Sequence, residues 1–179
     1  FLSEVISRCQ MINGLLGASL PRDHAYGFIK LGRLVECADM TTRIMDVGAG
    51  DIMERAGRFG AIDPLLWGAL LQALSAAAAY RREVGPIIEK DAALNFIFLS
   101  STFPRSIKYF VRETRKELMR LNNHDLAIRA VERLRRRLTR LDAEHFTSGE
   151  LHDYIDDFQL QLTSLDAAIQ ATWFSWENA

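Results

Sequence analysis

Apolar residues recur at steps of three and four along almost the whole of this 179-residue sequence. That spacing places them on one side of an α-helix, so it predicts a series of amphipathic helices. No window shows the alternation of apolar and polar residues that a half-buried β-strand would need. The pattern therefore restricts the chain to an all-α fold, in which helices cover one another's apolar sides.

Prolines and capping residues divide this pattern into separate helices. Pro64 follows an aspartate and is typical of a first helical turn, and Thr147 with Glu150 forms the pattern of a capping box. The connections are short, which favours antiparallel neighbours. We expect one domain over residues 1–179, an antiparallel up-and-down helical bundle of about seven helices. The expected helices cover residues 2–16, 23–58, 63–82, 86–101, 104–121, 125–141 and 147–173.

The helix expected over residues 63–82 has apolar residues almost all round, so we place it at the centre of the bundle. The preceding helix contains the segment Asp46-Val-Gly-Ala-Gly-Asp51, which is similar to the glycine loop of nucleotide-binding methyltransferases. Such a loop needs a strand before it and a helix after it. Because a helix pattern precedes this segment, we expect a helix break around Gly48–Gly50 and no cofactor.

Charge is distributed unevenly although the formal net charge is only −1. Residues 105–140 hold twelve Lys or Arg against four Asp or Glu, whereas residues 141–179 hold eight acidic residues and no Lys or Arg. The basic helix is expected to lie beside the acidic one, so that the charges largely cancel. Nucleic-acid or phosphate binding is the weaker alternative, and it would use Arg133, Arg135, Arg136, Arg137 and Arg140.

Cysteine and histidine usage argues against a metal site. Cys9 and Cys37 are too few for a disulfide framework or a four-ligand zinc site, and we expect both to be reduced and buried. His152 and Asp156, four residues apart, have a spacing that would let them share a cation, but we interpret them as ordinary polar surface residues. No metal is predicted, because no ligand spacing links His24, His124, His145 and His152.

Location is suggested by what the sequence lacks. No signal-peptide pattern opens it, and the uncharged stretch 64–80 is short for a membrane span. We therefore expect a cytoplasmic protein without membrane contact. The first residue is Phe1, which indicates a fragment or a trimmed product.

One helix carries a charged stripe opposite its apolar side. Arg33, Glu36, Asp39 and Arg43 fall within an arc of about 120°. Arg33–Glu36 and Asp39–Arg43 have the spacing of ion pairs, so the stripe is either an ordinary solvated face or a ligand-binding one. Arg105 stands at the start of a later helix, where a cation is unfavourable, and this predicts a carboxylate or an anionic ligand beside it.

The segment 28–46, Phe-Ile-Lys-Leu-Gly-Arg-Leu-Val-Glu-Cys-Ala-Asp-Met-Thr-Thr-Arg-Ile-Met-Asp, resembles the core motif of the bacterial alpha-E domain family. Trp67, then Tyr80-Arg81-Arg82, then Phe103-Pro104-Arg105-Ser106 match later stretches of that family in the same order. Two departures matter. Glu36-Cys37 stands where the family has Glu-Arg, and the chain resembles only the second half of the longer family members.

This resemblance implies a function. Family members accompany circularly permuted ATP-grasp ligases, so it implies an accessory domain of peptide synthesis or modification. Its partner would be the ligase or the missing first half, with a homo-oligomer as a further option. The implied site is a charge-paired groove that holds a peptide or another anionic ligand. The residues carried over to it are Arg33, Glu36, Asp39, Arg43, Tyr80, Arg82 and Arg105.

Two other functions stay open at this stage. The domain could be an enzyme that uses Glu36 as general acid or base, or a purely structural interaction bundle. No Ser-His-Asp or Cys-His arrangement can be proposed from the sequence, and Cys37 would need a base to act as a nucleophile.

Overall fold

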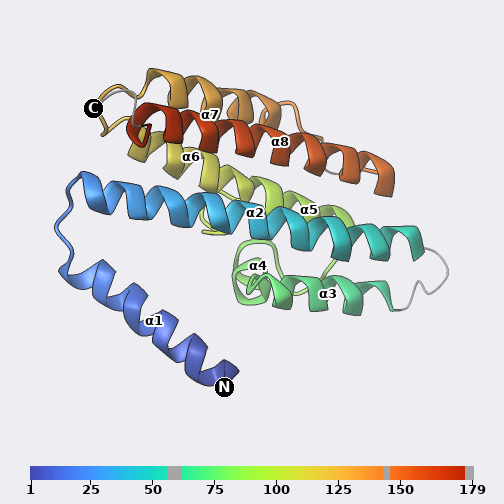
Figure 1. Cartoon of the computed structure of the whole chain (residues 1–179). Coiled ribbons are helices and arrows are strands. Elements are labelled where there is room, and N and C mark those ends of the chain that lie inside the picture. Colours follow the sequence, from blue (N-terminus) through green and yellow to red (C-terminus); the bar gives the residue numbers. More distant parts are fainter. Residues whose placement is uncertain (56–61, 143–145, 176–179) are drawn as a thin grey trace.

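A computed structural model describes residues 1–55, 62–142 and 146–175. Over these residues the chain is helical and contains no strand, which confirms the all-α prediction (Figure 1). Within the same part of the chain, no helix has the length and apolar composition needed to cross a membrane. The helices are α1 (Leu2–Ser19), α2 (His24–Arg55), α3 (Asp63–Ala73), α4 (Ala77–Glu83), α5 (Lys90–Leu99), α6 (Ile107–Leu118), α7 (Asp125–Leu138) and α8 (Ser148–Trp173).

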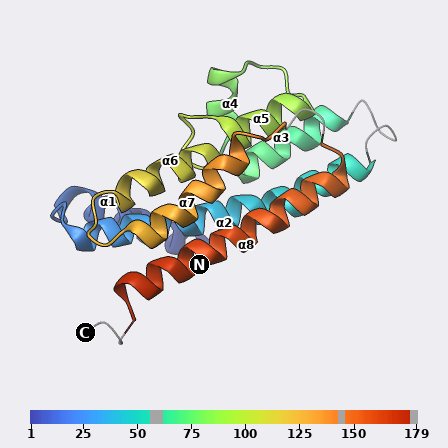
Figure 2. The same ribbon diagram turned by 90° about the horizontal axis from the view of Figure 1, so that it is seen from above.

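Four of these helices, α2, α6, α7 and α8, form the central bundle, in which each packs against two of the others. Ser148 at the start of α8 contacts Gly50 near the end of α2, and Trp173 at the end of α8 contacts Phe28 near the start of α2. The two longest helices are therefore antiparallel and lie side by side (Figure 2). Their apolar sides meet in one core, with large side chains such as Met45, Phe110 and Phe158 fully buried.

The shorter helices α3 and α5 pack on the side of this bundle, against α2 and α6 respectively. The helix expected over residues 63–82 is in fact two, because Ser75 adopts a left-handed backbone conformation with φ of 54°. The predicted central position is also wrong: Leu65 on α3 is 72% exposed. The continuous helix α2, which contacts α3, α6 and α8, takes the place expected for that helix.

Helix α2 runs unbroken through the segment in which a break was predicted, so that prediction is wrong. Glycine costs a helix about 1 kcal/mol relative to alanine, but tertiary packing overrides this preference. A Cβ atom on Gly48 would lie 2.6 Å from Cδ1 of Leu70, so this glycine allows α3 to approach α2 closely. Because the segment is helical, its backbone N–H groups cannot form a phosphate-binding loop.

Helix α1 forms as predicted, but its apolar side does not reach the core. No residue of α1 is buried. The connection at residues 20–23 joins α1 to α2, and from there α1 points away from the bundle (Figure 1). Cys9, expected to be buried, is exposed; it and the half-buried Cys37 are free thiols. More than half of the surface of several large side chains is open to solvent: Leu2, Ile6, Met11, Ile12 and Leu15.

Candidate functional site

A groove of about 790 Å³ runs along α2 and contains part of the predicted charged stripe. Helix α2 supplies most of its lining, the connection between α5 and α6 supplies Pro104 and Arg105, and α1 supplies Asn13. The lining residues are Asn13, Tyr26, Lys30, Gly32, Arg33, Leu34, Glu36, Cys37, Met40, Thr41, Ile44, Leu74, Pro104, Arg105 and Tyr109.

Three of the predicted site residues, Arg33, Glu36 and Arg105, come together in this groove although Arg105 is distant in sequence. Thr41 Oγ1 donates a hydrogen bond of 3.2 Å to the Arg105 carbonyl and so fixes the start of α6 against α2. Both arginine side chains are exposed, and neither makes an ion pair within the described ranges. The carboxylate or anion expected beside Arg105 is thus not supplied by the described part of the chain.

Cys37 lines the same groove as these two arginines. Burial raises the pKa of its thiol, while the positive charges of Arg105 and Arg33 and a hydrogen bond with Thr41 act against the rise. Because burial wins, the thiol stays protonated at neutral pH and is a poor nucleophile.

Glu36 lies one residue away on the same wall, and its side chain is exposed. No hydrogen bond or ion pair orients its carboxylate within the portion of the chain that is described. A general acid or base needs such positioning, so its catalytic role stays a prediction.

Asp39 and Arg43 pair with each other, as their spacing predicts. Arg43 Nε donates to Asp39 Oδ2 at 2.7 Å, and this hydrogen bond raises the pKa of the arginine. Arg43 does not line the groove; it borders a neighbouring apolar hollow between α2 and α3. This pair therefore flanks the groove instead of facing into it.

Tyr80 and Arg82 are placed elsewhere. Tyr80 is fully buried, and its hydroxyl donates a hydrogen bond of 2.9 Å to the Ile87 carbonyl, which holds the segment after α4 in place. Arg82 is exposed on α4 and does not line the groove. The resemblance linked both residues to the site, but the fold separates them from Arg33 and Arg105.

A buried charge cluster at the end of the groove was missed by the sequence analysis. Lys30 Nζ contacts Glu117 at 2.7 Å and Glu113 at 3.5 Å, and both carboxylates are buried on α6. Burial alone would lower the pKa of Lys30, but the two carboxylates raise it above its ordinary value. Glu113 and Glu117 lie beside the apolar positions of the same helix, and this spacing could have predicted a cationic partner on a neighbouring helix. The sequence alone does not identify Lys30 as that partner.

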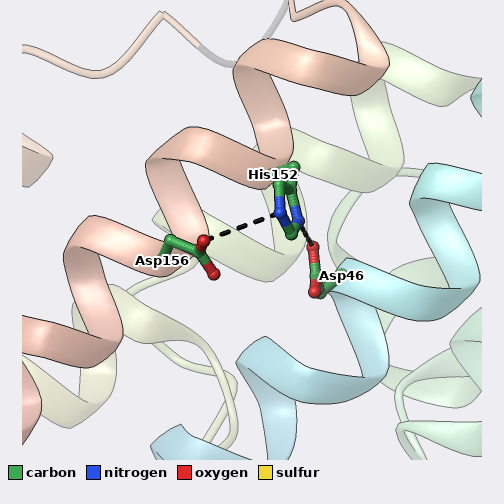
Figure 3. Close-up of side chains that lie close together, drawn as sticks. All are labelled: Asp46, His152 and Asp156. Atoms are coloured by element: carbon green, nitrogen blue, oxygen red, sulfur yellow. Dashed lines mark hydrogen bonds and ion pairs between the residues drawn. The ribbon is translucent and has the colours of Figure 1, made fainter.

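A second unpredicted cluster joins α2 to α8. His152 Nδ1 lies 2.7 Å from Asp46 Oδ1, and its Nε2 lies 3.5 Å from Asp156 Oδ2 (Figure 3). These groups could also supply three ligand atoms to a metal ion, since one such atom from each lies within 4.8 Å of the others. Each imidazole nitrogen already faces a carboxylate, however, which is the arrangement of a doubly paired imidazolium. The sequence spacing indicated Asp156 as the partner of His152 but not Asp46.

The model of a protein family described as "a predicted alpha-helical domain with a conserved ER motif" matches residues 1–174. The chain belongs to this Alpha-E family. The resemblance found in the sequence is therefore confirmed for nearly the whole chain. No curated protein and no solved structure matches it. In this Alpha-E domain, positions 36–37 in the groove are Glu-Cys.

Proposed function

We propose that this Alpha-E domain is an accessory binding domain, whose groove receives an anionic group of a peptide or of a partner protein. Arg33 and Arg105 carry the proposal, because they share one groove and neither forms an ion pair with a described residue. Arginine binds carboxylates and phosphates through two parallel hydrogen bonds, so two adjacent guanidinium groups favour such a ligand.

The uncovered side of α1 supports a protein as the partner. An isolated helix of 18 residues is marginally stable in water, and most helices in proteins are stabilised by packing of their apolar side. Helix α1 has one acidic and one basic residue, Glu4 and Arg8, which pair with each other, so it lacks the basic face of a membrane-surface helix. A protein surface that covers α1 and places an acidic group in the groove would satisfy both features.

For the biological setting, we infer a system in which an ATP-grasp-type ligase makes or modifies a peptide. This part of the proposal rests on the family resemblance. The partner would then be the ligase, or another half of the same protein, and binding rather than catalysis would be the role of the domain.

The test is to replace the two groove arginines. A pull-down with mass spectrometry identifies the bound protein, and titration calorimetry then measures its affinity for Arg33→Ala and Arg105→Ala. We expect each change to weaken binding about tenfold or more, because a charge-assisted hydrogen bond is lost. The melting temperature should stay nearly unchanged, because both side chains are exposed and neither forms an ion pair with a described residue.

Arg81→Ala is the matched control, since Arg81 is equally exposed but lies on α4 outside the groove. If Arg81→Ala weakens binding as much as the groove variants do, general charge attraction explains the result. If both groove variants unfold, the arginines have a structural role and the proposal is wrong.

A further inference from the structure

A separate cavity of about 740 Å³ lies on the bundle between the second half of α7 and α8, away from the groove. Four arginines belong to its lining: Arg133, Arg136 and Arg137 lie on α7, and Arg140 lies in the turn that follows this helix. Their spacings of three and four residues place them on one side of the helix. Helix α8 contributes Tyr154 and Gln161, which lie seven residues apart on the side that faces α7.

The expected cancellation of charge between α7 and α8 is only partial. Arg137 pairs with Asp157 at 2.9 Å. Arg133, Arg136 and Arg140 form no ion pair over the ranges that the structure describes. The favourable interaction of cations with a helix C-terminus accounts for part of this basic run. That interaction does not account for the buried polar groups of Tyr154 and Arg137 in the same cavity.

Two buried hydrogen-bond donors in the cavity lining have no acceptor among the described residues. Tyr154 is 8% exposed, and its hydroxyl has no hydrogen-bond partner among the described residues. The Nε atom of Arg137, whose guanidinium lies 4.6 Å from the centre of the Tyr154 ring, has none either. Buried polar groups are nearly always paired, so two unpaired donors in one cavity lining indicate a missing acceptor. Burial raises the pKa of Tyr154 to about 12, so its hydroxyl keeps its proton at neutral pH.

We propose that this cavity binds a compact polyphosphate, such as pyrophosphate or the phosphates of a nucleoside triphosphate. Phosphate oxygens accept hydrogen bonds from guanidinium groups in pairs, and they would also accept from Tyr154 Oη and Arg137 Nε. Gln161 Oε1 is also buried and has no partner among the described residues. Rotation of the side-chain amide by 180° would exchange this oxygen for the NH₂ group, which can donate to a phosphate oxygen. This site is independent of the proposed partner groove.

Asp142 and Glu150 line the cavity and Asp157 contacts one of its arginines, but each of these acidic residues already interacts with another group. Glu150 accepts hydrogen bonds from the backbone N–H and the hydroxyl of Thr147, as the capping box of α8 requires. Asp157 is held by Arg137. The positive charge of Arg133, Arg136 and Arg140, which form no ion pair with a described residue, is therefore available to the cavity.

The same acidic helix favours a compact ligand over an extended nucleic acid. Arg133 and Arg140 are about 10 Å apart along the axis of α7, which a short chain of phosphates can bridge. A longer strand would have to continue along the acidic helix α8, where exposed carboxylates such as Asp153 repel its backbone. The cavity is also within the usual size of small-molecule sites, roughly 300–1,000 Å³.

The test uses titration calorimetry of the chain with inorganic pyrophosphate, inorganic phosphate and ATP. We expect pyrophosphate and ATP to bind more tightly than phosphate, with affinities that fall as salt is added. Replacing both Arg133 and Arg140 with glutamine should weaken pyrophosphate binding more than tenfold. Arg129→Gln, on the same helix but outside the cavity lining, is the matched control and should change binding less than twofold.

Tyr154→Phe separates a binding role from a structural one. It removes only the unpaired hydroxyl, so the melting temperature should hold or rise while pyrophosphate affinity falls about fivefold to tenfold. Failure of pyrophosphate and ATP to bind at millimolar concentration would overturn the proposal, as would equal losses in Arg129→Gln. A single-stranded oligonucleotide that binds more tightly than ATP, and loses affinity with the same arginines, would instead make the surface a nucleic-acid site.

Discussion

His152 connects α8 to α2 through one imidazole and two carboxylates. Its hydrogen bond with Asp46, followed by the charges of Asp46 and Asp156, raises its pKa above the ordinary value. A raised pKa means that the protonated form binds its surroundings better in the folded chain than in the unfolded chain. The pair therefore stabilises the fold while His152 is charged.

The expected result is a pH-dependent stability that His152→Gln removes. The contribution is fully present below the unfolded pKa, about 6.5, and is lost as the pH rises through the higher folded value. Thermal melts from about pH 5.5 to about pH 8.5 should show the wild-type protein losing its advantage over the variant as the pH rises. An advantage that grows with pH would contradict this assignment of charge.

Among individual residue pairs, sequence spacing identified only those within one helix. The pairs Asp39–Arg43 and His152–Asp156 were visible because four residues make one helical turn. Asp46 and Lys30 find their partners across a helix–helix contact, and no spacing along the chain encodes such a contact. The convergence of Arg33 and Arg105 was proposed only from the family resemblance, for the same reason.

Among the helices, α2 shows how packing overrides local preference. Two glycines in three residues indicated a break, yet α2 stays helical because α3 and α8 pack against it there. The same helix contains Gly32, whose Cβ would meet no atom within 4 Å. Helix α2 thus contains Gly48, which close packing against α3 requires, and Gly32, which no such contact requires.

Opposite effects are expected at these two positions. Gly32→Ala should raise the free energy of unfolding by roughly 0.5–1 kcal/mol, because alanine is the better helix former and the site is open. Gly48→Val should lower it by roughly 1–3 kcal/mol, because the side chain displaces Leu70. Urea denaturation measures both, and a stabilising Gly48→Val would show that α3 does not pack closely there.

Helix boundaries were predictable where capping chemistry marks them. The capping box of Thr147 and Glu150 starts α8 as expected, because both of its reciprocal hydrogen bonds form. The division between α3 and α4 was not predictable, since Ser75 adopts its left-handed conformation without a glycine or proline nearby. Tertiary contacts of the buried Leu74 and Ala76 hold that turn.

For the molecule as a whole, the bundle and α1 differ in how they are stabilised. The bundle closes one apolar core, whereas α1 keeps its apolar side in solvent. Periodicity predicted that α1 is amphipathic, but periodicity does not say whether the surface that covers a helix belongs to the same chain. The all-α bundle was therefore predictable, and the open position of α1 was not.

Substitutions in α1 should leave folding intact. Ile6→Ser and Ile12→Ser should change the free energy of unfolding by less than about 0.5 kcal/mol, because both side chains are more than half exposed. Leu134→Ala, in the core, should lower it by roughly 2–5 kcal/mol. Urea denaturation distinguishes the two classes. A large loss at Ile6 would show that α1 folds back onto the bundle in solution.

The uninterrupted course of α2 links distant surfaces of the molecule. A helix of 32 residues is about 48 Å long, and without a hinge its two halves cannot tilt separately. A partner that displaces α2 at Arg33 would therefore also displace Asp46, which lies further along the same helix and contacts His152. Binding of a partner in the groove would then change the pKa of His152 on the other side of α2.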